Sequence, residues 1–488
     1  MFSRGVLMVR NTGLLGLLFV VGVCSASGQV IKFERTYGGT SADEAYAVQQ
    51  TTDSGYILAG NTNSTGTGNK VYLVRTNATG DTLWTKSIGG LINDYGHSVA
   101  QTTDGGFIVA GTTYNLGAGN GDALLIRTDS AGHVLWMRAY GGTDYDEALS
   151  VVQTTDGGFA FGGSSLSFGG ATFYVVRTNQ NGDTVWTRTY GITGEDYGSC
   201  IQRTVDGGFI VAGTVGLSFS SGDASLVKVS GSGALQWIRT YAGPQTSNGL
   251  SVQQTTDYGY VIAGTATTGA RGRDIYLVRT TTNGDTLWTR LYGGSGDDVG
   301  VSIRKTSDSG YVLTGNTSSF GARGLDVFLL KTNQIGETVW LRLFGGSGFD
   351  EGKDLQQTSD GSYVIAGRTT SYGAGSFDAY LIKTDQSGLI TFAAEQWNQV
   401  VQGFRLAQNY PNPFNPSTTI SFQIPEESEI SVGVFDMLGR EVARLIDGRI
   451  RGGMHSVQWN AGDASAGTYF YRLAAGGKVV TGRMVLIK

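Results

Sequence analysis

The sequence predicts an all-β protein in which a seven-bladed β-propeller with four-stranded antiparallel blades precedes a small C-terminal β-sandwich. Three observations support this fold class: a segment that returns seven times at intervals of 50 to 52 residues, four strand-like runs within each repeat, and a change of composition near residue 400. No helical period separates the strand-like runs, which is typical of a propeller.

The first 28 residues are expected to be a cleaved signal peptide. An apolar run over residues 13–23 follows two arginines and precedes small residues, and it is too short to span a bilayer. Cys24 keeps a lipoprotein open as an alternative, although Val23 stands where a small residue usually precedes a lipidated cysteine. Cleavage near Gln29 would leave Cys200 as the sole cysteine, so we expect no intrachain disulfide. No later segment is expected to span a membrane.

The repeats define the blades. The first contains the runs AYAVQQT, GYILAGNT, VYLVRT and DTLWTKS, which we name strands A, B, C and D. Asp-Gly or Asn-Gly pairs between A and B and between C and D predict type I′ hairpin turns, which need positive φ at both central residues. The segments of type QTTDGGFIVAG begin at Gln50, Gln101, Gln153, Arg203, Gln254, Lys305 and Gln357.

The spacing within the repeats predicts how the ring closes. The strand-D aromatic residue, mostly tryptophan, always lies 18 residues before the next strand-A threonine, and Phe33 has this spacing before Thr51. We therefore expect the run Ile31–Tyr37 to be a strand D that joins the last blade and hides an open edge. Phe392, nine residues after Lys383, fits the same pattern and leaves a C-terminal closing strand open. The expected domains are a propeller over 29–393, a linker over 394–403 and a C-terminal domain over 404–488.

The C-terminal residues carry sequence motifs that do not occur in the repeats. Motifs occur at Tyr410–Pro416 (YPNPFNP), Val434–Arg440 (VFDMLGR) and Gly467–Arg472 (GTYFYR), before a basic end. This segment resembles the C-terminal sorting domain of type IX secretion substrates. The resemblance implies a small β-sandwich that the type IX secretion machinery recognises at the outer membrane of a Gram-negative cell. It implies that the protein is secreted or displayed on the cell surface.

Aspartate recurs eight residues before each strand-A threonine, except in the fifth repeat, where Ser247 stands. The six are Asp43, Asp94, Asp146, Asp196, Asp298 and Asp350. If strand A lines a central channel, they form an acidic ring at one mouth, where calcium or a cationic ligand could bind. The favoured interpretation is structural, because no calcium-loop motif occurs: each aspartate caps its own D–A turn or pairs with a basic residue of a neighbouring blade. No cofactor and no firm metal site are therefore predicted.

Other repeated residues are expected to serve the fold. Asp53 and its equivalents lie in the A–B turns, where aspartate hydrogen-bonds its own backbone, and the evenly spaced tryptophans suit packing between blades. A functional site should instead break the sevenfold symmetry, and all length variation lies between strands B and C.

The D–A and B–C connections are expected on the same face of the propeller, because successive strands alternate in direction. Aromatic residues and arginines in the B–C loops are our candidates for ligand binding, and they suit a glycan or a protein ligand. These candidates are Tyr114, Phe168, Phe219, Arg271, Arg273, Phe320, Arg323 and Tyr372. That the aromatic rings fold back over the blades is an equally open alternative.

Composition and motifs narrow the function. The net charge of −5 comes without a concentrated basic segment, so nucleic acid is not an expected partner. The three histidines are scattered, and no zinc cluster, phosphate loop or nucleophile motif occurs. The sequence therefore predicts a non-catalytic binding or adhesion module. Two alternatives stay open: a secreted enzyme that acts on polysaccharide with carboxylates near the channel mouth, and a structural surface-layer component.

Overall fold

The computed structural model divides the chain into two compact units, residues 1–391 and 392–488. It describes residues 32–216, 222–269, 272–321, 324–390 and 405–486, the last without 407–408, 410–411, 413, 425–426, 451–452, 463 and 476–477. The predicted signal peptide, the predicted linker and Phe392 lie outside these residues. In the described part, no helix is long and apolar enough to cross a membrane.

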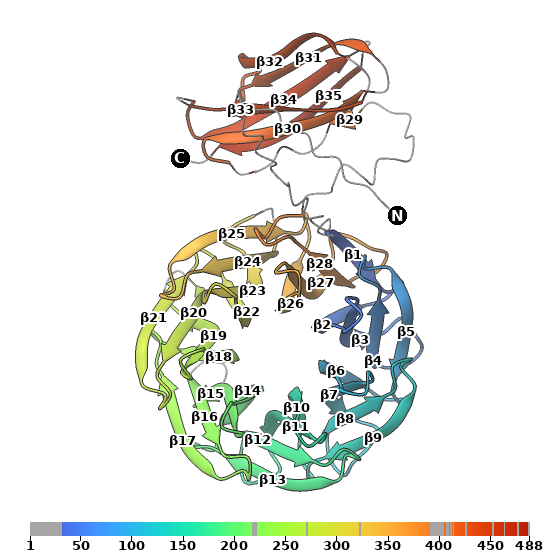
Figure 1. Cartoon of the computed structure of the whole chain (residues 1–488), viewed down its shortest axis with the longest axis vertical. Coiled ribbons are helices and arrows are strands. Elements are labelled where there is room, and N and C mark those ends of the chain that lie inside the picture. Colours follow the sequence, from blue (N-terminus) through green and yellow to red (C-terminus); the bar gives the residue numbers. More distant parts are fainter. Residues whose placement is uncertain are drawn as a thin grey trace, which may run out of the picture. The chain divides into compact units, whose positions relative to one another are not determined.

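The first unit is a ring of seven four-stranded antiparallel sheets around a central axis (Figure 1). Blade 1 contains β2 (Asp43–Gln50), β3 (Tyr56–Thr62), β4 (Lys70–Thr76) and β5 (Thr82–Ile88). Blade 2 contains β6 (Asp94–Gln101), β7 (Phe107–Thr113), β8 (Asp122–Thr128) and β9 (Val134–Tyr140). Blade 3 contains β10 (Asp146–Gln153), β11 (Phe159–Ser165), β12 (Thr172–Thr178) and β13 (Thr184–Tyr190).

The remaining four blades repeat this order. Blade 4 contains β14 (Asp196–Arg203), β15 (Phe209–Val215), β16 (Asp223–Val229) and β17 (Leu235–Tyr241). Blade 5 contains β18 (Ser247–Gln254), β19 (Tyr260–Thr267), β20 (Arg273–Thr280) and β21 (Thr286–Tyr292). Blade 6 contains β22 (Asp298–Lys305), β23 (Tyr311–Thr317), β24 (Asp326–Thr332) and β25 (Thr338–Phe344). Blade 7 contains β26 (Asp350–Gln357), β27 (Tyr363–Thr369), β28 (Asp378–Lys383) and β1 (Phe33–Tyr37).

The N-terminal strand closes the ring, as the spacing predicted. Strand β1 pairs antiparallel with β28, with Phe33 opposite Lys383 and Tyr37 opposite Ala379. Just before β1, the ammonium of Lys32 forms an ion pair of 2.6 Å with Asp385. The strand that comes first in the chain is therefore the outermost strand of the last blade, so the free edge of β28 is covered.

The hairpin turns differ from the expected type I′ turns. In blade 1, the Thr51 amide donates to the Gly55 carbonyl and the Ser54 amide donates to the Thr51 carbonyl, both at 2.9 Å. The central residues of this turn are Thr52 and Asp53, and within residues 51–55 only Ser54 has positive φ, 68°. The C–D turn repeats this arrangement at Gly80. The prediction of type I′ is wrong, because a type I turn followed by one left-handed residue makes these connections. The Asp53 carboxylate accepts from the Thr51 hydroxyl and the Gly55 amide, which holds the turn.

Every strand A carries a β-bulge next to a glycine of strand B. In blade 1, the register between β2 and β3 shifts between Ala45 and Ala47, so Tyr46 is the unpaired residue. A Cβ on Gly60 would lie 1.8 Å from the carbonyl oxygen of Glu44, so only glycine permits this close approach of the backbones. A bulge redirects side chains. Here it lies in strand A, the innermost strand of each blade (Figure 1).

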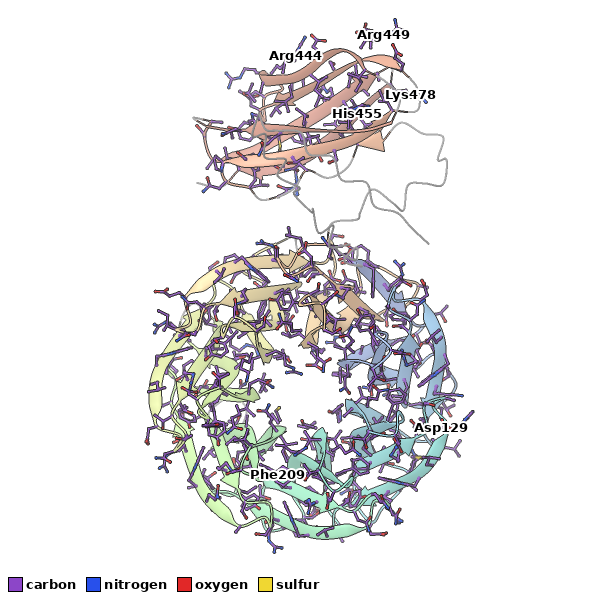
Figure 2. The ribbon with its side chains drawn as sticks, in the orientation of Figure 1. Asp129, Phe209, Arg444, Arg449, His455 and Lys478 are labelled. Carbon is purple, nitrogen blue, oxygen red and sulfur yellow. The ribbon has the colours of Figure 1, made fainter. Side chains whose placement is uncertain are left out.

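Aromatic rings join each blade to the next. The strand-D aromatic of one blade packs against the first strand-B residue of the following blade, as in Trp84 with Phe107 and Phe33 with Tyr56, each with ring centroids 6.0 Å apart. Six such pairs involve the predicted tryptophans, and the expectation that these rings pack between blades is confirmed. Figure 2 shows Phe209, the partner of Trp186, within the ring and Asp129 on its outer rim.

The second unit is a two-sheet sandwich with its own core. One sheet contains β29 (Arg405–Leu406), β30 (Ser417–Ile424) and β33 (Gly453–Asn460). The other contains β31 (Ser428–Phe435), β32 (Glu441–Ile450), β34 (Gly467–Ala475) and β35 (Lys478–Leu486). Ile420, Val432, Leu473 and Met484 are all fully buried in one cluster drawn from both sheets, so this unit has the β-sandwich architecture that the resemblance implied.

Candidate functional site

The six predicted aspartates are buried in the D–A turns. The Asp43 carboxylate accepts the Gly39 amide at 2.7 Å and the Ser64 hydroxyl at 2.6 Å. A backbone amide of the preceding turn donates in the same way to Asp94, Asp146, Asp196, Asp298 and Asp350. Among the described residues, no three His, Cys, Asp or Glu side chains lie close enough together to hold a metal ion. In six blades the aspartate therefore connects the B–C loop to the D–A turn.

The predicted B–C loop residues do not form one cluster. Phe168 lies against Tyr174, with centroids 5.8 Å apart, and the Tyr372 hydroxyl donates to the Gly345 carbonyl at 2.9 Å. Arg273 forms an ion pair of 3.0 Å with Asp297. Phe320 is 42% exposed on blade 6. Three further candidates lie outside the described residues: Phe219, Arg271 and Arg323.

Among the candidates that the structure describes, Tyr114 lines a pocket together with residues from three blades. This pocket, which we name the blade 1–3 hollow, has a volume of about 570 Å³. It lies where the D–A turns and B–C loops meet, on the face that the strand directions predicted. Its lining residues are Ala42, Glu44, Tyr46, Asn61, Asn63, Asn69, Tyr95, His97, Tyr114, Tyr145 and Glu147.

A continuous row of rings connects the three blades. Tyr46 meets His97 edge to face at 6.0 Å, and His97 stacks on Tyr95 at 6.3 Å with an interplanar angle of 8°. Tyr95 then meets Tyr114 at 6.3 Å, and Tyr114 meets Tyr145 at 6.4 Å. The hollow therefore offers ring faces and hydroxyl groups along its length, a combination that binds ligands with both apolar and polar surface.

His97 is the titratable residue at the centre of this row. Burial lowers the pKa of His97 to about 4, so the imidazole is neutral at pH 7. Its Nε2 lies 3.4 Å from the Thr112 hydroxyl. A neutral imidazole offers one donor and one acceptor, which suits a ligand hydroxyl group better than an anion.

The two carboxylates of the hollow have different surroundings. Glu44 is hydrogen-bonded by Tyr46 and forms an ion pair of 2.6 Å with Arg368 of blade 7. Glu147 accepts the Tyr145 hydroxyl at 3.0 Å, and burial raises its pKa above the usual value, against the effect of hydrogen bonds from Tyr145 and Ser164. In blade 7, Glu351 lies between Arg368 and Lys353.

Two residues of the hollow, Tyr46 and His97, are the strand-A bulge residues of blades 1 and 2. The bulge residues of the seven blades are Tyr46, His97, Leu149, Ser199, Leu250, Val301 and Lys353. Blades 3 to 6 have leucine, serine, leucine and valine at this position. The sequence prediction missed Tyr46 and His97 because it compared the positions that repeat. The variable position three residues after each turn aspartate was the signal that could have found them.

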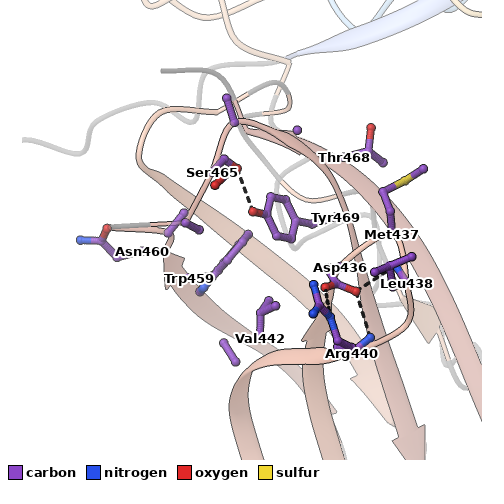
Figure 3. A pocket seen from close by; sticks show the side chains of 15 residues that line it. Asp436, Met437, Leu438, Arg440, Val442, Trp459, Asn460, Ser465, Thr468 and Tyr469 are labelled. Carbon is purple, nitrogen blue, oxygen red and sulfur yellow. Dashed lines mark hydrogen bonds and ion pairs between the residues drawn. The ribbon is translucent and has the colours of Figure 1, made fainter.

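The sorting-domain unit contains a separate hollow of about 800 Å³. The 436–440 turn, Trp459 and Tyr469 line it (Figure 3). Asp436 holds this turn through its hydrogen bond of 2.7 Å to Arg440, and the Tyr469 hydroxyl donates to the Ser465 carbonyl at 2.7 Å. Met437 and Leu438 project from the turn and are 68% and 79% exposed. The VFDMLGR and GTYFYR motifs therefore meet at one place.

Fold and sequence together define the class of this protein: a seven-bladed β-propeller joined to a β-sandwich export domain. Residues 408–488 match the secretion system C-terminal sorting domain family, which confirms the resemblance. The protein thus carries the tag of type IX secretion substrates, which implies recognition by that machinery and export to the cell surface or beyond. No curated protein matches the chain.

Solved structures with a similar fold have low sequence identity to this chain. PorZ of Porphyromonas gingivalis, a surface component of the type IX secretion system, is 12% identical with a TM-score of 0.45; the match covers 93% of this chain and 60% of PorZ. The polysaccharide lyase Uly1 is 12% identical with a TM-score of 0.46, over 75% of this chain and 94% of Uly1. The Pan2 WD40 domain of Neurospora crassa is 9% identical with a TM-score of 0.44, over 72% of this chain and 95% of that domain.

Proposed function

We propose that this protein is an exported, non-catalytic binding module whose propeller holds a glycan in the blade 1–3 hollow. The observation that carries the proposal is the row of five rings from Tyr46 to Tyr145, with three asparagines beside it. The C–H faces of a sugar ring can pack on tyrosine, while its hydroxyls bond to amide, imidazole and carboxyl groups. The sorting domain would deliver this surface to the outside of the cell, where polymeric glycans occur.

The test is a binding screen of glycans and cell-wall polymers on purified residues 29–488, with and without calcium. We expect saturable binding that Tyr95→Ala and Tyr114→Ala each weaken by about tenfold, since a buried aromatic contact is worth about 1.5 kcal/mol. Phe320→Ala is the matched control, because Phe320 is a similarly exposed loop aromatic on blade 6. An effect of Phe320→Ala equal to that of Tyr114→Ala would place binding on the wider loop face instead.

A secreted enzyme acting on polysaccharide is the second candidate. The observation that favours it is the presence of Glu44 and Glu147 in one hollow, with the pKa of Glu147 raised by burial. Two carboxyl groups in different environments can share acid and base roles. If the binding screen releases shortened products and Glu147→Gln abolishes that release, the enzyme proposal replaces the binding-module proposal. Binding without product release would support the module.

A further inference from the structure

The charged side chains that line the blade 1–3 hollow are acidic. The lining contains two glutamates and four tyrosines, together with a histidine that is neutral at pH 7, and no lysine or arginine belongs to it among the described residues. One ring already has a cation of the protein near it: the Lys353 ammonium, which is ion-paired with Glu351, lies 5.9 Å from the centroid of Tyr46. The faces of tyrosine rings attract cations because of their quadrupole.

One carboxylate of the hollow, Glu147, forms no ion pair with a lysine or arginine among the residues that the structure describes. Arg368 neutralises Glu44 at 2.6 Å, and Glu351 of blade 7 is similarly paired. For Glu147, the contacts that the described residues provide come from hydroxyl groups, at Tyr145 and Ser164. Glu147 also interacts electrostatically with Tyr114. A partly buried carboxylate without a cation is costly in the ionised form, and a cationic ligand would relieve that cost.

We propose that the blade 1–3 hollow selects a glycan whose sugar carries a free ammonium group, with the ammonium bound between Glu147 and the rings of Tyr114 and Tyr145. This inference rests on the proposed glycan-binding function and names its ligand class, an amino sugar that is not acylated. The carboxylate supplies a charge-assisted hydrogen bond and the rings supply cation–π attraction.

The asparagines favour a sugar over a lysine side chain as the source of the ammonium. Asn61, Asn63 and Asn69 line the hollow from the B–C side of blade 1. The Asn69 amide donates to the Tyr95 hydroxyl at 3.2 Å, and the Asn61 side-chain oxygen accepts the Gly96 amide at 2.9 Å. Each amide has further hydrogen-bonding capacity, which matches the hydroxyl groups of a sugar. A lysine stem is aliphatic and would leave that capacity unused.

The test compares two oligosaccharides that differ at one group, a glucosamine hexamer and an N-acetylglucosamine hexamer, by calorimetry on residues 29–488 at pH 6. We expect the glucosamine hexamer to bind about tenfold more tightly, as one desolvated ammonium–ring contact predicts. Glu147→Gln should remove this preference, so that the two hexamers bind the variant equally. Glu337→Gln removes an exposed carboxylate from a C–D turn on the opposite face and should preserve the preference.

Each other outcome has a defined meaning. Equal binding of the two hexamers overturns the ammonium inference and leaves the glycan-binding proposal standing. Tighter binding of a lysine-rich peptide than of the glucosamine hexamer overturns the assignment of the ligand as a sugar. Binding of neither hexamer and of no other glycan in the screen overturns the proposed function as well. Because the central comparison uses the unmutated protein, a variant that fails to fold does not affect it.

Discussion

Each blade holds a basic residue at the end of strand C, and its partner is the aspartate of the A–B turn. Arg75 lies 2.5 Å from Asp53, and the side chain of Arg75 is 7% exposed whereas that of Asp53 is 63% exposed. The aspartate is therefore a solvated cap over a buried cation. Removing a cap of this kind costs more than an ordinary surface ion pair, because the cation would remain buried and unpaired.

These caps predict a sensitivity to acid. The Thr154 hydroxyl is the largest cause that lowers the pKa of Asp156, to about 2; partial burial opposes it and Arg177 adds to it. The folded pKa lies below the ordinary value of 3.8, so the cap stabilises the fold above that value and its contribution disappears as the pH falls to 2. We expect Asp156→Asn to lower the unfolding free energy at pH 7 by about 1 kcal/mol after allowance for solvent screening, and the difference from the unmutated protein to vanish near pH 2. Denaturant titrations at pH 7, 4, 3 and 2 measure it.

The control for this variant is Asp144→Asn, which removes an exposed carboxylate from a D–A turn. Its unfolding free energy should follow that of the unmutated protein at every pH. A constant deficit of Asp156→Asn from pH 7 to pH 2 would contradict the argument, since it would show that the loss comes from the turn backbone and not from the ionised cap.

The secondary-structure elements were the part of the fold most open to prediction. Seven repeats with the same internal spacing predicted seven copies of one structural unit. The 18-residue spacing from Phe33 to Thr51 identified the closing strand. The turn type was predicted wrongly, because an Asp-Gly pair supplies the left-handed residue for either kind of turn. What decides between them is the Asp53 carboxylate, which bonds the Thr51 hydroxyl and so favours a type I geometry before that residue.

Strand β1 is the element whose removal should affect the propeller most. Without residues 29–37, blade 7 loses its outermost strand, β28 gains a free edge, and the Phe33 ring, 2% exposed, no longer packs on Tyr56. We expect the truncated chain to aggregate or to unfold several degrees earlier, because open sheet edges pair with other chains. Phe33→Ala keeps the strand and should cost about 3 kcal/mol. Thermal unfolding with size-exclusion chromatography checks both; an unchanged melting temperature on truncation would show that another segment closes the ring.

At the scale of the whole molecule, the candidate site could not be predicted from the sequence, although its face could. The hollow depends on neighbours from different blades, such as Asn69 with Tyr95 and Tyr114 with Tyr145. Tyr114 was identified as a B–C loop aromatic, but Asn69, Tyr95 and Tyr145 were not, because comparing the copies draws attention to positions that repeat. The B–C loops attracted attention because they vary in length, yet the ring-bearing positions beside the axis vary in chemistry at constant length.

The two units should separate in function as they do in packing. The sandwich has its own core, from Phe414 to Leu486, and the propeller cores share no residue with it. We therefore expect removal of residues 404–488 to abolish export while the purified propeller keeps its ligand affinity within about twofold. Cell fractionation and calorimetry measure the two properties.

As a control, Met437→Ser with Leu438→Ser changes two exposed residues of the 436–440 turn and should leave propeller affinity unchanged. If truncation instead weakens ligand binding by an order of magnitude or more, the sandwich contributes to the site, and the blade 1–3 hollow is only part of it.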